Sequence, residues 1–118
     1  MSEAAAVPSN ELKLHTFAWE DAQVVKCSGR LTTEYSSALK SHVQTLMPNA
    51  KRIILDLKEV TRMDSSGLGA LVAVYVSAKK SKCTLLVVNY NQSIRDLLGL
   101  ANLLSIFEQC AEVDMRLP

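Results

Sequence analysis

Apolar and polar residues alternate in two short segments near the start of the chain, after a small, polar lead-in over residues 1–10 that we expect to be flexible. The segment ELKLHTF spans residues 11–17, and AQVVKCSGRL spans residues 22–31. Alternation with a period of two is typical of strands that bury one face. The four residues AWED between the segments are few enough to join the two strands as a hairpin.

The period then changes to that of a helix, because one helical stripe carries Tyr35, Leu39, Val43 and Leu46. Thr32 or Thr33 is predicted to cap the start of this helix, and Pro48 follows its end.

Two later runs, RIILDL at residues 52–57 and CTLLVV at residues 83–88, are nearly all apolar, which is typical of strands buried on both faces. A longer apolar segment over residues 67–80 ends in lysines and predicts a second helix. Residues 91–99 predict a short helix that is capped at Asn91 or Ser93 and ended by Gly99. Residues 104–109, LSIFEQ, predict a last strand, and the tail over residues 110–118 predicts a helical turn or more.

The predicted order is strand, strand, helix, strand, helix, strand, helix, strand (β-β-α-β-α-β-α-β). Helices that connect apolar strands imply parallel neighbours in a sheet, whereas the hairpin is antiparallel. The pattern therefore predicts a single α/β domain with a mixed sheet of about four to five strands.

Composition removes several classes of function. The 118 residues hold thirteen Lys plus Arg against twelve Asp plus Glu, so a net charge of +1 attracts neither nucleic acid nor an anionic membrane. Cys27, Cys83 and Cys110 lack metal-type spacing, so we expect no metal and a reducing compartment. No secretion signal or long apolar run is apparent, so we expect a cytoplasmic protein without membrane insertion.

The junction between the strand at residues 52–57 and the second helix carries Asp64, Ser65, Ser66 and Gly67. One interpretation is that Asp64, Ser65 or Ser66 only caps the helix, which stabilises it by about 1 kcal/mol, and that Gly67 only eases the turn. The other is that a serine there is modified, because helix N-termini favour negative groups such as phosphate.

An enzyme is not predicted. A hydrolase nucleophile at Ser65 would call for a Gly-x-Ser-x-Gly context and a nearby histidine base, and neither His15 nor His42 is placed by the sequence to act on it. No phosphate-binding glycine loop is present, so no cofactor is expected.

From about Leu12 to Glu108 the chain resembles the anti-sigma factor antagonists, whose domain is called STAS, so that residues 11–118 would form one STAS domain. In that family an Asp-Ser-Ser-Gly-Leu-Gly stretch opens the second helix. Here the matching residues are Asp64, Ser65, Ser66, Gly67, Leu68 and Gly69.

The resemblance implies a regulatory protein without catalysis. In that family the unphosphorylated antagonist binds an anti-sigma factor and so releases a sigma factor. The anti-sigma factor is also a serine protein kinase that phosphorylates the residue matched by Ser65, and a phosphatase reverses this modification. A phosphate there adds charge to the binding surface and switches the interaction off.

The partner-binding surface is expected around the same helix. Leu68, Leu71, Val72 and Tyr75 should pack on the sheet, leaving an outer side of small residues that suits a protein partner. Where the family often reads Gly-Glu-Leu-Asp, this chain has Arg30 and Thr32 in place of the two acids. Arg30 or Arg62 could pair with a phosphate on Ser65, or either could simply be solvated. The residues assigned to the surface are Arg30, Thr32, Arg62, Met63, Ala70, Ala73 and Val74.

Two other functions stay open. The chain could be a stand-alone STAS subunit that regulates a membrane transporter or lipid-trafficking complex, in which Ser65 is only part of the cap. It could also be a scaffold subunit of a stress-signalling assembly.

Overall fold

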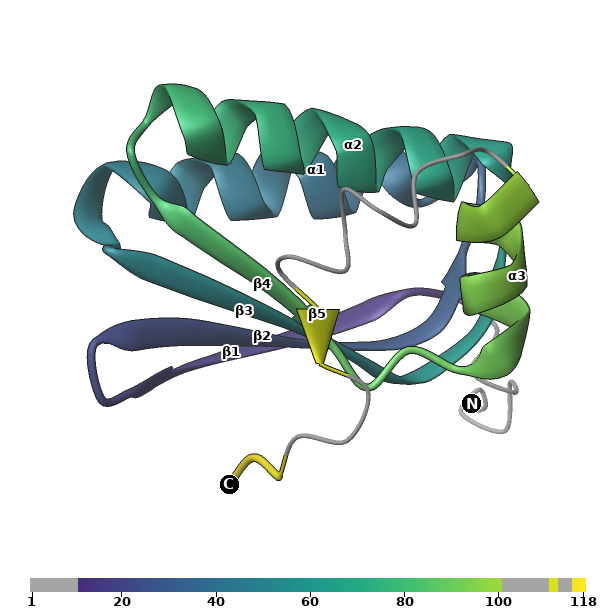
Figure 1. Cartoon of the computed structure of the whole chain (residues 1–118), viewed down its shortest axis with the longest axis horizontal. Coiled ribbons are helices and arrows are strands. Elements are labelled where there is room, and N and C mark those ends of the chain that lie inside the picture. The colour runs from purple at the N-terminus through teal and green to yellow at the C-terminus, as the bar shows by residue number, and fades with distance from the viewer. Residues whose placement is uncertain (1–10, 101–110, 113–115) are drawn as a thin grey trace, which may run out of the picture.

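Two helices lie side by side across one face of a five-stranded sheet in the computed structural model of the chain (Figure 1). The structure describes residues 11–100, 111–112 and 116–118. The strands are β1 (Lys13–Trp19), β2 (Ala22–Leu31), β3 (Arg52–Met63), β4 (Thr84–Val88) and β5 (Ala111–Glu112). The helices are α1 (Ser36–Leu46), the 3₁₀ turn η1 (Met47–Asn49), α2 (Ser65–Lys80) and α3 (Gln92–Leu100).

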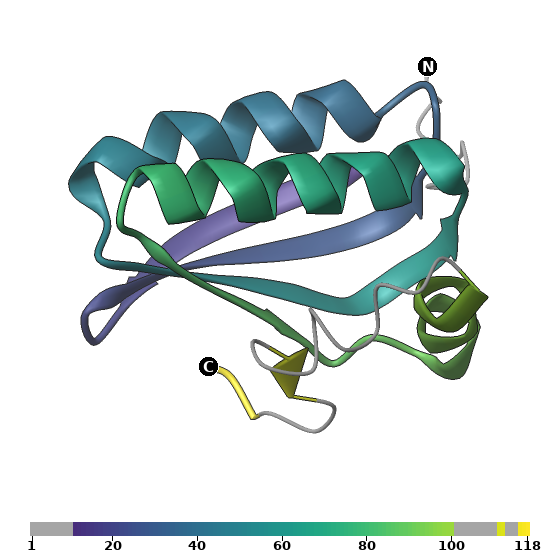
Figure 2. The same cartoon turned by 45° about the horizontal axis from the view of Figure 1, so that its top comes forward.

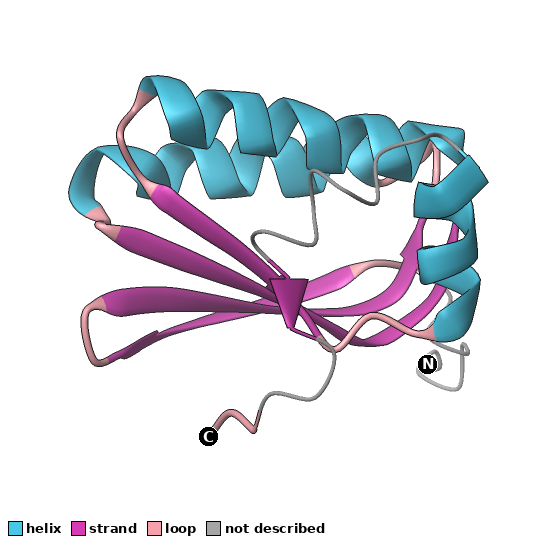
Figure 3. Cartoon of the chain, viewed as in Figure 1, coloured by secondary structure: helices cyan, strands magenta, loops and turns pink. Residues whose placement is uncertain are grey.

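The sheet has the strand order β1-β2-β3-β4-β5. β1 and β2 form an antiparallel hairpin, and every other neighbouring pair is parallel. The predicted mixed α/β sheet is confirmed. Its parallel pairs are joined by helices, as the connections in Figure 3 show.

Both faces of the central strands are buried, which explains their unbroken apolar runs. The main core lies between the sheet and the two long helices, where Leu55 and Leu57 of β3 are fully buried together with Leu39 of α1 and Leu71 of α2. On the opposite face, Val24 and Ile54 are also fully buried, in a smaller cluster that includes Leu117 near the chain end.

The helix over residues 36–46 begins differently from the prediction. Neither Thr32 nor Thr33 caps it with its side chain, because the N-cap residue is Tyr35 and makes no side-chain cap bond. Instead, the carbonyl of Thr32 accepts hydrogen bonds from the backbone N–H groups of Tyr35 and Ser36, each at 2.9 Å. The Thr33 side chain instead forms its hydrogen bonds at the start of α2.

Three further boundaries differ from the prediction. β3 continues to Met63, well past the predicted residues 52–57, because it stays paired with β2 as far as Leu31. Gly99 does not end the third helix, which continues to Leu100. The tail holds strand β5 at Ala111–Glu112, which pairs with β4, where a helical turn was expected. The strand predicted over residues 104–109 and the lead-in over residues 1–10 lie outside the described residues.

Candidate functional site

The start of α2 is built around the side chain of Asp64, which is the N-cap residue of the helix. One carboxylate oxygen, Oδ1, accepts a hydrogen bond from the backbone N–H of Gly67 at 3.0 Å. The Asp64 backbone N–H is bonded to the carbonyl of Leu31, at the end of the neighbouring strand, at 3.4 Å. The prediction of a capping residue at this junction is confirmed, and the capping residue is Asp64.

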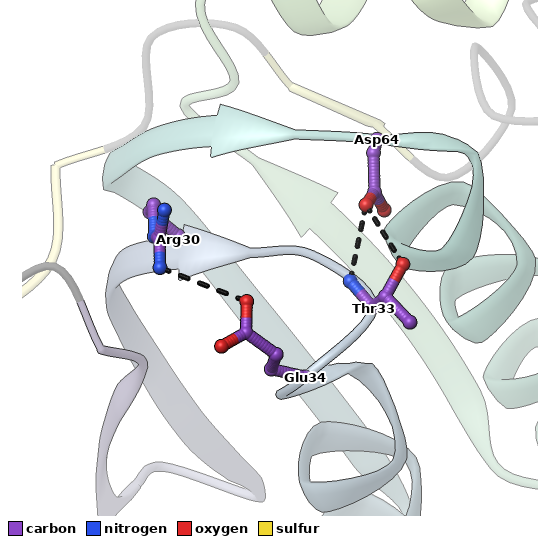
Figure 4. Close-up of polar contacts among 4 residues, drawn as sticks. All are labelled: Arg30, Thr33, Glu34 and Asp64. Carbon is purple, nitrogen blue, oxygen red and sulfur yellow. Dashed lines mark hydrogen bonds and ion pairs between the residues drawn. The ribbon is translucent and has the colours of Figure 1, made fainter.

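The second carboxylate oxygen of Asp64 holds the loop between β2 and α1. Oδ2 accepts from the backbone N–H of Thr33 at 3.0 Å and from its hydroxyl at 3.1 Å, as Figure 4 shows. The Thr33 hydroxyl also lies 3.0 Å from the hydroxyl of Ser66. One carboxylate therefore ties together the beginnings of both long helices, through residues that are 31 positions apart.

These hydrogen bonds favour the charged form of the carboxylate. The backbone N–H of Gly67 makes the largest contribution, and with the N–H and hydroxyl of Thr33 it lowers the pKa of Asp64 below its ordinary value of 3.8, against a smaller opposing effect of burial.

A lowered pKa predicts how stability depends on pH. The stability that charged Asp64 contributes is fully present above pH 3.8, its ordinary pKa, and is lost as the pH falls through the lowered pKa of the folded protein. We therefore expect the difference in unfolding free energy between the wild type and Asp64→Asn to be constant near neutral pH and to shrink in acid. Urea unfolding of both proteins at a series of pH values measures it. A difference that stays constant down to the lowest pH would contradict this prediction.

Ser65 is placed differently from its neighbours. It is the first residue of α2, its side chain is exposed, and none of the described residues forms a hydrogen bond with its hydroxyl. The carboxylate of Asp64 already supplies the cap, and the hydroxyl of Ser66 faces Thr33. Of the two serines, Ser65 is thus the one whose hydroxyl is open to solvent.

Next to Ser66, an open groove of about 310 Å³ runs between α1 and α2, the two helices seen side by side in Figure 2. Its α2 side is formed by residues with little or no side chain, and its α1 side by hydroxyls and one cation. The lining residues are Ser66, Gly69, Ala70 and Ala73 on α2, and Ser36, Ser37 and Lys40 on α1.

The glycines of the motif have different surroundings. A Cβ on Gly67 would lie 2.1 Å from the carbonyl oxygen of Leu31, so only glycine lets α2 start this close to β2. A Cβ on Gly69 would meet nothing within 4 Å. Leu68, between them, is buried in the main core. The sequence motif thus combines one glycine required by packing with one that leaves an open surface.

The predicted outer side of α2 is partly wrong. Val74 is fully buried, and Ala78 and Ala70 are 2% and 6% exposed. The reason is that α2 packs against both the sheet and α1, so its buried arc is wider than the stripe of Leu68, Leu71, Val72 and Tyr75. Val74 therefore has no side-chain surface to offer a partner. Ala70 and Ala73 still line the groove.

The other residues assigned to the surface lie at the ends of β2 and β3. Arg30 and Arg62 are opposite one another in these parallel strands, and Arg62 is exposed. The Arg30 guanidinium lies 3.8 Å from the carboxylate of Glu34 (Figure 4). Met63 is half-buried against the core, and the hydroxyl of the partly buried Thr32 has no hydrogen-bond partner in the described structure. A pairing of either arginine with a phosphate stays a prediction.

Other kinds of site find little support in the described part of the chain. No group of three or more His, Cys, Asp or Glu side chains there could hold a metal ion. The Nε2 atom of His42 lies 2.7 Å from the hydroxyl of Thr16, which joins α1 to β1. None of the described helices is both long enough and apolar enough to cross a membrane.

Solved structures share this fold. An anti-sigma factor antagonist from Mycobacterium paratuberculosis superposes with a TM-score of 0.78 at 21% identity, over 92% of this chain and 91% of the other. A sulfate transporter family protein from Wolinella succinogenes gives 0.71 at 18% identity, over 80% and 79%. The phosphorylated form of the Bacillus cell fate determinant SpoIIAA gives 0.67 at 15% identity, over 88% and 92%. At identities of 15% to 21%, the similarity to these structures shows a shared fold.

The sequence itself matches the family described as "Mlab, STAS domain" over residues 15–108, which is most of the chain. This range contains the whole Asp64–Gly69 motif and both helices that border the groove. The chain therefore belongs to the STAS-domain family, whose fold it shares with anti-sigma factor antagonists.

Proposed function

We propose that the protein is an anti-sigma factor antagonist whose binding to its anti-sigma factor is switched off by phosphorylation of Ser65. The observation that carries this proposal is the division of roles at the start of α2. Asp64 provides the cap, while the exposed Ser65 hydroxyl has no bond to any described residue. Since the helix does not need Ser65 as its cap, the cap interpretation leaves this serine without a role.

A phosphate on Ser65 would change the surface without unfolding the helix. It adds a charge of about −1.5 to −2 at the positive end of the α2 dipole, where negative charge is tolerated. In the sequence, Ser65 lies between Asp64, which carries a carboxylate, and Ser66, which lines the groove. A partner docked there would meet a desolvated double charge, so binding is lost while the fold remains.

The partners that follow from this proposal are an anti-sigma factor that is also a serine protein kinase, and a phosphatase that acts on phosphorylated Ser65. We place the docked surface on the α1–α2 groove, which Ala70 and Ala73 line, and keep Arg62, exposed near the end of β3, as a further candidate contact. No cofactor and no catalysis by this chain are part of the proposal. The phosphorylated form of the structurally similar Bacillus SpoIIAA supports modification in this fold.

One other function has a specific observation in its favour. The fold is shared with a sulfate transporter family protein, and the matching family is described by the name Mlab. As a regulatory subunit of a membrane transporter, the chain would dock permanently, and a charge on Ser65 would alter binding little.

The two functions separate in a paired capture experiment. Ser65→Ala and Ser65→Glu versions of the full chain are used as baits in native lysate, and mass spectrometry identifies what each retains. We expect Ser65→Ala to retain a kinase-type anti-sigma factor and Ser65→Glu to lose it by about tenfold or more, because even a single charge is repelled in a desolvated interface.

The chain provides a matched control for this charge. Ser93 is also exposed and lies in the first turn of another helix, α3, so Ser93→Glu adds the same charge in a similar local setting. Its capture should equal that of the wild type. The antagonist proposal fails if Ser65→Glu and Ser65→Ala retain the same partner equally, and a membrane transporter as that partner would favour the alternative.

A further inference from the structure

A second cavity, of about 370 Å³, lies at the far end of α2 from Ser65. Figure 1 shows this end at the left, where the chain leaves α2 and turns down into β4. Sites for small molecules begin at about this volume. The walls come from the last turns of α2 and the first residues of β4, and include Tyr75, Lys79, Lys82, Cys83, Thr84 and Leu85.

The charged groups that line this cavity are both cations. Lys79 and Lys82 contribute ammonium groups, and among the described residues no Asp or Glu lines it. Burial raises the pKa of the Cys83 thiol above its ordinary value of 9.0, so the thiol is neutral and does not oppose an anion. Thr84 adds a hydroxyl that can donate a hydrogen bond, while the half-buried Tyr75 ring adds apolar surface.

Lysines at the end of a helix often serve only to hydrogen-bond its last carbonyl groups. Here the backbone already does so. The carbonyls of Ser77, Ala78 and Lys79 accept N–H groups from Ser81 at 2.9 Å, Cys83 at 2.9 Å and Lys82 at 3.3 Å. The ammonium group of Lys79 instead lies 5.4 Å from the centre of the Tyr75 ring, which holds it at the cavity wall.

Lys82 occupies a backbone position that suits glycine better. Its φ of 57° lies in the left-handed region just after the helix, where a side chain costs energy that glycine does not. Backbone preference alone therefore does not explain a lysine here. Lys82 lines the cavity, where a positive charge can contribute to binding a ligand.

We propose that this cavity binds a small organic phosphate. Two ammonium groups match the double negative charge of a phosphate monoester, and lysine binds phosphate as a compact point charge. The exposed Thr84 can donate its hydroxyl to a phosphate oxygen, and the ring of the half-buried Tyr75 provides apolar surface for the carbon atoms. The site is separate from Ser65 and does not depend on the antagonist function.

The test is an NMR titration of the ¹⁵N-labelled full chain with phenyl phosphate, with inorganic phosphate as a second probe. We expect saturable shifts in the backbone amides from Lys79 to Leu85 and none from Ser65 to Gly69. Phenyl phosphate should bind about tenfold more tightly than inorganic phosphate, because its ring can contact the ring of Tyr75. Equal affinity would overturn the organic part of the proposal, and no saturable shift would overturn all of it.

Two variants separate this site from general surface charge. Lys82→Gly removes one ammonium group at a position where glycine suits the backbone, so the fold is retained, and phenyl phosphate should bind about tenfold more weakly. Lys80→Gln removes the same charge from an exposed residue of the same helix end that does not line the cavity, and should leave affinity unchanged. Equal losses in both variants would show that only bulk charge attracts the anion.

Discussion

Replacing Gly67 by alanine is expected to lower the free energy of unfolding by about 3 kcal/mol. The new Cβ would lie 2.1 Å from the carbonyl oxygen of Leu31 and 2.9 Å from Cγ of Met63. The first contact is with backbone, and that carbonyl also accepts the N–H of Asp64, so it cannot move without disturbing the cap. Urea unfolding at neutral pH measures the loss.

Gly69→Ala is the matched control for this prediction. It adds the same methyl group two residues later in the same helix, where nothing lies within 4 Å. Because alanine favours a helix more than glycine does, this variant should be more stable than the wild type by about 0.5–1 kcal/mol. Changes of the same sign and size in both variants would contradict the close approach of α2 to β2.

Replacing Gly69 by arginine is expected to weaken binding of the partner captured with Ser65→Ala by about 100-fold, while leaving the fold intact. Gly69 is exposed and lines the α1–α2 groove, so a long charged side chain there fills the proposed docking surface. Titration calorimetry with the purified partner measures the affinity. The melting temperature checks the fold.

The control for this substitution is Gly99→Arg. Gly99 is also an exposed helical glycine at which an added Cβ would meet nothing within 4 Å, but it lies in α3, away from the groove. The partner affinity of this variant should match that of the wild type. If Gly69→Arg also binds normally, the partner does not use the α1–α2 groove.

Features set by local sequence could be predicted well. The buried strands β3 and β4 followed from apolar runs, and the parallel pairing followed from the helices between them. That one residue of the stretch Asp64–Ser66 caps α2 followed from residue type, although which of the three does so did not. The resemblance added the family, which the sequence match over residues 15–108 bears out.

Features that depend on tertiary contacts could not be predicted from the sequence. Thr33 looked like a cap for α1, but its hydroxyl bonds to Asp64, 31 residues away, and no local pattern reports such a contact. Val74 was predicted to lie on the surface because the predicted hydrophobic face of α2 assumed that the helix packs on the sheet alone. It is fully buried because α2 is covered by α1 as well. The packing need for Gly67 likewise comes from Leu31, on another strand.

A phosphate on Ser65 is proposed to decide whether the partner binds. The most direct measurement is the affinity of the purified partner for the unmodified chain and for the chain phosphorylated at Ser65 alone, with circular dichroism of both. We expect phosphorylation to lower the affinity by about 100-fold or more with unchanged helix content, because the interface cannot desolvate the double charge. Equal affinities for the two forms would contradict it and leave Ser65 as an ordinary residue of the helix start.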